Sequence, residues 1–90
     1  MIEQIQVYVS GIVQGVGFRS LVGRCALKHN IKGYVRNLED GQVEICAQGT
    51  NKAIQEFFNE IQKNPGRALI ERFDEQKAEC IKIYSSFEVI

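Results

Sequence analysis

The stretch Ser10–Arg19, SGIVQGVGFR, decides how the chain folds, because it lies between a strand-like pattern and a helix-like pattern. It contains three glycines, at positions 11, 15 and 17. Glycine readily adopts left-handed backbone angles, so a turn of this kind can direct successive N–H groups toward an anion. Arg19 adds a planar, permanently charged guanidinium that suits phosphate or carboxylate. The stretch therefore predicts an anion-binding loop.

The segments on either side of this loop have different periods. Glu3–Ser10 alternates apolar and polar residues, which predicts a strand with one buried face. From Phe18 onward the apolar residues recur every three or four positions, which predicts a helix that ends with Asn30 as a left-handed cap. This arrangement places Arg19 in the first helical turn, beside N–H groups that have no partner within the helix.

The rest of the chain supplies a hairpin, a second helix and further strands. We expect strands at 31–37, 42–48 and 68–74, a loop at 75–79, and strand-like pieces at 80–84 and 87–90. Thr50 or Asn51 can cap a second amphipathic helix, which Asn64-Pro65-Gly66 ends. The order β-α-β-β-α-β plus a C-terminal strand predicts an α+β, ferredoxin-like sandwich. In that fold an antiparallel sheet carries two helices on one face. Residues 1–90 are expected to form a single domain.

Composition excludes several classes of protein. The chain has 44% hydrophobic and 24% charged residues and a formal net charge of zero, as is typical of a globular domain. Residues 1–38 contain five basic residues and one acidic residue, so the half with the glycine loop is positive. This favours a small anionic ligand over nucleic acid, whose binding proteins are usually basic throughout. We find no membrane span or secretory signal and expect a cytoplasmic protein.

The cysteines and the single histidine do not form a recognisable metal motif. Cys25, Cys46 and Cys80 are widely spaced, so we expect no metal site and no cofactor, with a Cys46–Cys80 bridge left open. Cys25 is expected in the core, and His29 as a cation or a partly buried side chain at the helix end.

The loop also lacks nucleotide-binding signatures, since it has neither the Lys-Ser/Thr ending of a P-loop nor the spacing GxGxxG. Instead, SGIVQGVGFR followed by KGYVRNLEDGQVE resembles the acylphosphatase family. The similarity extends from Ile5 to Ile90 and includes the closing Phe87-Glu88-Val89.

This resemblance implies metal-free hydrolysis of an acyl phosphate to a carboxylate and inorganic phosphate. It implies Arg19 and Asn37 as the catalytic residues, with Arg19 holding phosphoryl oxygens and Asn37 placing the attacking water. The implied phosphate-binding loop consists of Gly11, Ile12, Val13, Gln14, Gly15, Val16, Gly17 and Phe18. The expected partner is a small-molecule acyl phosphate, with no nucleic acid and no membrane, and the chain is expected to be a monomer.

Two departures from the family pattern and two alternatives accompany this hypothesis. Ile12 replaces a residue that is often basic, and Ser20 replaces one that is often bulky.

One alternative is a non-catalytic phosphate- or acyl-phosphate-binding or assembly module, since the same domain occurs attached to larger proteins. A chain of this length, starting with Met, favours a free-standing enzyme. The other alternative is an RNA-binding or regulatory domain, for which only Tyr8 and Tyr34 provide aromatic rings on the expected central strands.

Overall fold

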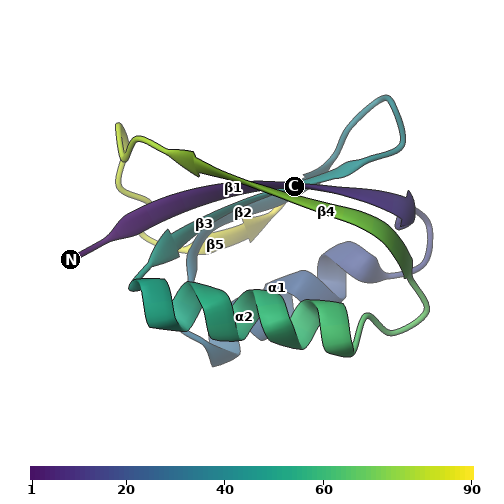
Figure 1. The fold of residues 1–90 in the computed structure, drawn as a ribbon, viewed down its shortest axis with the longest axis horizontal. Helices are drawn as coiled ribbons and strands as arrows, with labels where there is room; N and C mark the ends of the chain where they lie inside the picture. Colours follow the sequence, from purple (N-terminus) through teal and green to yellow (C-terminus); the bar gives the residue numbers. More distant parts are fainter.

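The computed structural model describes residues 1–90 and contains five strands and two helices. These are β1 (Glu3–Ile12), α1 (Phe18–Lys28), β2 (Lys32–Asn37), β3 (Val43–Gly49), α2 (Asn51–Lys63), β4 (Leu69–Ala78) and β5 (Phe87–Val89). The strands form one sheet in the order β4-β1-β3-β2-β5. Both helices lie on the same face of this sheet (Figure 1). The predicted ferredoxin-like α+β sandwich is confirmed.

The core lies between the helices and the sheet, where the apolar patterns of both meet. The alternating residues Ile5, Val7 and Val9 of β1 point toward the helices and are buried. The apolar stripe of α2 is also buried and packs in the same cluster; it consists of Ile54, Phe57, Phe58 and Ile61. Burying a side chain of this size contributes roughly 1.5–3 kcal/mol relative to exposure, so this stripe fixes α2 on the sheet.

The helix boundaries follow the predicted caps. Asn30 has a left-handed φ of 57°, as expected of a residue that ends a helix. Thr50 caps α2, because its side chain accepts a hydrogen bond of 3.2 Å from the backbone N–H of Ala53. The two helices span 11 and 13 residues, and neither is both long and apolar enough to cross a membrane.

Two expectations about the C-terminal third are wrong. The loop predicted at 75–79 is mostly strand, because β4 continues to Ala78 and stays paired with β1 as far as Gln4. No strand forms at 80–84. That segment instead passes over the open face of the sheet, which is the face opposite the two helices. There the main-chain oxygen of Lys82 accepts a hydrogen bond from the side chain of Gln48.

The sheet is mixed rather than fully antiparallel. Neighbours in the order β4-β1-β3-β2 pair antiparallel, as predicted, but β5 pairs parallel with β2. This pairing carries Val89 and Ile90 past α1, where Gly23 leaves room for the side chain of Val89. The end of the chain thereby reaches the first turn of α1.

Candidate active site

The glycine loop joins β1 to α1 and leaves a row of backbone N–H groups without backbone partners. Gly15 and Gly17 have left-handed φ angles of 74° and 78°. None of the N–H groups from Gln14 through Ser20 donates to another backbone carbonyl. Gly17, the N-cap of α1, provides no side-chain cap, and the first turn contains no acidic residue. The donors and the positive end of the helix dipole therefore remain available to an anion.

A depression of about 160 Å³ opens beside this loop. It is lined by Val13, Gly15, Gly17, Phe18, Arg19, Ser20, Asn37 and Val89. Arg19 enters from the first turn of α1 and Asn37 from the end of β2, so two residues far apart in the sequence meet at one site. The fold thus brings a guanidinium, a carboxamide and unpaired N–H groups around a single hollow.

Other residues of the predicted phosphate loop do not line this depression. Gly11 belongs to β1, with φ 129°, and a Cβ there would lie 2.1 Å from the main-chain oxygen of Leu69. Ile12 is 56% exposed, and its backbone pairs with Leu69. Both positions are therefore explained by the pairing of β1 with β4. Val16 packs against the hydrophobic core and is also absent from the lining.

The side chain of Gln14 connects the loop to the β2–β3 hairpin by hydrogen bonds. Its side-chain Nε2 donates to the main-chain oxygens of Leu38 and Gln42, at 2.8 and 2.9 Å. Leu38 directly follows Asn37, so these bonds fix the position of the loop relative to the carboxamide. Sequence reasoning assigned only the backbone of Gln14 to the site and missed this contact of its side chain.

Arg19 contacts the end of the chain as well as the depression. Its Nη1 donates to the main-chain oxygen of Ile90, which the parallel pairing of β5 brings alongside α1. A guanidinium has five N–H donors, so this hydrogen bond orients the side chain and leaves donors for a ligand. This second contact of Arg19 depends on the position of β5, which the sequence did not indicate.

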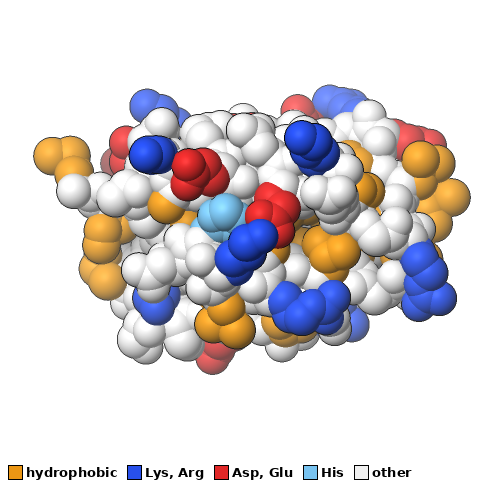
Figure 2. Space-filling view, turned by 90° about the horizontal axis from the view of Figure 1, so that it is seen from below, with side chains coloured by type: hydrophobic (Ala, Val, Ile, Leu, Met, Phe, Trp, Pro, Cys, Tyr) orange, Lys and Arg blue, Asp and Glu red, His pale blue; other side chains and the backbone are white.

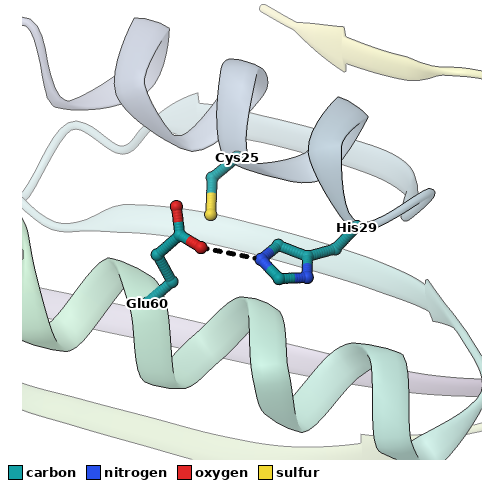
Figure 3. Close-up of side chains that lie close together, drawn as sticks. All are labelled: Cys25, His29 and Glu60. Atoms are coloured by element: carbon teal, nitrogen blue, oxygen red, sulfur yellow. Dashed lines mark hydrogen bonds and ion pairs between the residues drawn. The ribbon is translucent and has the colours of Figure 1, made fainter.

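A second cluster of polar side chains lies between the two helices (Figure 3). The Nε2–H of His29 donates to Glu60 Oε1 at 2.9 Å, and the thiol of Cys25 points toward the same carboxylate. Lys28 Nζ also lies 3.0 Å from Glu60 Oε1. Hydrogen bonds from His29 and Lys28 lower the pKa of Glu60 to about 2, whereas burial raises the pKa of Cys25 to about 11.

Figure 2 shows part of the chain's single histidine at the surface of this helical face, among acidic and basic side chains; its side chain is 17% exposed. His29 is therefore partly buried at a helix end, as expected. Sequence reasoning missed the cluster because Glu60 belongs to the other helix. All three cysteines are free, so this structure has no bridge between Cys46 and Cys80.

This chain resembles known proteins in both its sequence and its fold. The family model for acylphosphatase matches residues 5–89. The chain belongs to the acylphosphatase family. An acylphosphatase from Archaeoglobus fulgidus is 45% identical over 85 residues, which are 94% of each chain. The crystal structure of acylphosphatase from Bacillus subtilis superposes with a TM-score of 0.92 at 31% identity and covers 100% of this chain and 99% of that one.

Acylphosphatase-like domains also occur inside larger proteins. Full-length HypF, solved in a phosphate- and nucleotide-bound form, contains a region that matches all of this chain with a TM-score of 0.90 and 34% identity. This chain spans only 12% of that protein. The same fold therefore occurs both in small acylphosphatases and as one region of a much longer protein.

Proposed function

We propose that this protein is an acylphosphatase, which hydrolyses an acyl phosphate to a carboxylate and inorganic phosphate. One observation carries the proposal: Arg19, Asn37 and the glycine loop line the same depression. Family membership supplies the activity class, and the geometry suggests how residues of this chain perform it.

We assign phosphate binding to the loop and to Arg19. The N–H groups of residues 14–18 and the guanidinium would donate to the non-bridging phosphoryl oxygens. Charge spreads over these oxygens in the transition state of phosphoryl transfer, so preformed donors lower the barrier without reorganising at the moment of reaction. The positive end of α1 acts on the same oxygens.

We assign placement of the nucleophile to Asn37. A carboxamide is a very poor base, but it can donate to and accept from a water molecule and hold that water in line with the leaving carboxylate. The leaving group of an acyl phosphate is already a good one. A phosphate oxygen of the substrate can take the proton from the attacking water, so the site needs no strong general base.

The alternative is a non-catalytic module of the same fold, such as the region within HypF. Nothing in the depression favours it, because the depression contains both Arg19 and Asn37. We also infer a cytoplasmic, monomeric protein without nucleic-acid partners. The three free cysteines support a cytoplasmic location, because thiols stay reduced in that compartment.

Hydrolysis of benzoyl phosphate in the presence of EDTA tests this proposal. Arg19→Ala and Asn37→Ala are each expected to lower kcat by at least about 100-fold, the usual cost of removing one preorganised donor. Arg24→Ala is the matched control, since Arg24 lies on the same helix but outside the depression. Wild-type turnover in both site variants would refute the residue assignment. A folded wild type that is inactive on every acyl phosphate would favour the binding module.

A further inference from the structure

We propose that Cys25, His29 and Glu60 bind one zinc-class divalent ion between α1 and α2. One ligand atom from each residue lies within 4.8 Å of the other two. Ligand atoms around a tetrahedral zinc ion are about 3.3–3.8 Å apart, given bonds of about 2.0–2.3 Å. Small side-chain rotations would bring the three ligand atoms to these separations. The ion would take the place of the Nε2 proton that now lies between His29 and Glu60.

The positions of the three residues suit a metal that bridges two helices. His29, the C-cap residue of α1, follows Cys25 by four positions, so the two side chains lie on one face; helical zinc motifs use the same spacing. Glu60 projects from α2 toward them (Figure 3). An ion bound by all three would cross-link the helices, and this predicts that binding stabilises the fold.

The chemistry of the donor set selects the ion. Thiolate, imidazole and carboxylate are all zinc ligands, and thiolate disfavours magnesium and calcium, which prefer oxygen. A thiolate and a carboxylate together carry two negative charges, which match a divalent cation. On binding, the S–H bond of Cys25 breaks, its proton goes to water, and the sulfur electron pair forms a bond to the metal. The Nε2–H bond of His29 also breaks; exchange with water leaves the neutral ring protonated on Nδ1, and the freed Nε2 electron pair forms a second bond to the metal.

The surroundings leave one coordination position open. Cys25 and Glu60 line a depression of about 230 Å³, which is completed by Leu21, Arg24, Lys28 and Asn64. A water molecule or a small anion can occupy the fourth position from this side. The depression shares no lining residue with the one that contains Arg19 and Asn37, so the proposed metal site is separate from the proposed catalysis.

Lys28 is the internal competitor for this site. Its ammonium lies 3.0 Å from Glu60 Oε1 and its side chain is 66% exposed, so an incoming ion can displace it into water. Removing the ammonium with Lys28→Gln is expected to tighten metal binding about two- to fivefold, the usual range for one exposed ion pair. An unchanged affinity in Lys28→Gln would show that the ion does not bind at Glu60.

Titration of the tag-free, reduced chain with Co²⁺ tests the proposal, because cobalt bound to a thiolate gives a characteristic charge-transfer absorption. We expect one ion per chain and competition by Zn²⁺. Binding should weaken at least tenfold in Cys25→Ser, His29→Gln and Glu60→Gln. It should be unchanged in Cys80→Ser, the control for an exposed thiol. The absence of a charge-transfer band would overturn the proposal, and so would loss of the band in Cys80→Ser with retention in Cys25→Ser.

Thermal unfolding provides a second measurement that does not depend on the buried Cys25 variant folding. At a free Zn²⁺ concentration 100-fold above Kd, the Tm of the wild type should rise by at least about 10 °C. His29→Gln and Glu60→Gln change side chains that touch solvent and should fold but lose this rise. An equal rise in these variants would overturn the proposal. Acylphosphatase activity, assayed with EDTA, should persist in all of them.

Discussion

Gly11 and Gly15 differ in the space that their missing side chains would occupy. A Cβ at Gly11 would meet the main-chain oxygen of Leu69, whereas a Cβ at Gly15 would meet nothing within 4 Å. Only the left-handed φ constrains Gly15. We therefore expect Gly15→Ala to cost about 1–2 kcal/mol of stability and Gly11→Ala more than about 3 kcal/mol. Urea unfolding measures both, and equal losses would show that β4 moves aside for the Gly11 variant.

Ile12 is the position at which this chain departs from the basic residue often found in the family. Its exposed side chain lies just before the loop, outside the depression. We expect Ile12→Arg to tighten inhibition by phosphate about two- to fivefold at low ionic strength, because an exposed charge near an anion contributes up to about 1 kcal/mol. Leu27→Arg, which adds the same charge near the far end of α1, is the control. An inhibition constant that is equal in wild type and Ile12→Arg would remove any role for this position.

At the scale of elements, Gln14 couples the glycine loop to the hairpin that presents Asn37. Because Gln14 bonds two carbonyls of the hairpin, its loss should let the loop and the carboxamide drift apart. A misplacement of about 1 Å can cost about 100-fold in rate, so we expect Gln14→Ala to lower kcat by at least about tenfold.

The control for Gln14 is Ser10→Ala. It removes a 3.1 Å hydrogen bond from β1 to the side chain of Gln42 on the same hairpin but leaves the loop untouched. Ser10→Ala should retain near-wild-type kcat. If Gln14→Ala also retained it, the loop would be held by its own backbone alone, and the positioning role would be wrong.

Local patterns predicted the elements well and their pairing less well. Alternation located β1, and helical spacing with caps located α1 and α2. The polar run after Asp74 looked like a loop because β4 is an exposed edge strand, held by main-chain pairing with β1 that composition does not reveal. The parallel pairing of β5 with β2 was also missed, because the sequence of a three-residue strand does not indicate which strand it pairs with.

At both polar sites, the active-site depression and the cluster between the helices, the sequence indicated residues close together in the chain better than contacts between distant segments. Arg19 could be placed from its position after the glycines, but Asn37 was identified through the resemblance to a family, since an asparagine at a strand end is common. The His29–Glu60 contact joins residues on different helices. The spacing of Cys25 and His29 was the one signal in the sequence that could have indicated that cluster.

At the scale of the whole molecule, the face of the sheet opposite the helices is held together by polar contacts. Glu44 of β3 is central to them, although its side chain is only 7% exposed. Its carboxylate accepts hydrogen bonds from Gln6 and Tyr8 at 3.2 and 3.1 Å, and from Arg36 Nε at 2.5 Å. One carboxylate thus joins strands β1, β2 and β3.

This network makes the stability of the fold depend on pH in a defined direction. Burial raises the pKa of Glu44, but the hydrogen bonds from Arg36, Gln6 and Tyr8 outweigh burial, so the pKa lies below the ordinary value of 4.5. In the unfolded chain the group titrates near that ordinary value. The folded state therefore binds fewer protons, and the stabilisation is complete above about pH 4.5 and is lost as the pH falls through the folded pKa.

Glu44→Gln tests this linkage, because it removes the charge and keeps the shape. We expect a loss of about 1–3 kcal/mol at pH 7, typical of a hydrogen-bonded buried charge, and a smaller difference from wild type as the pH falls below about 4.5. Urea unfolding from pH 3 to pH 7 measures both. Asp74→Asn removes the other arginine–carboxylate pair, with Arg72, whose side chains are exposed, and should cost less than about 1 kcal/mol. A loss in Glu44→Gln that stays constant over this pH range would mean that shape and packing, rather than the charge of Glu44, hold the open face together.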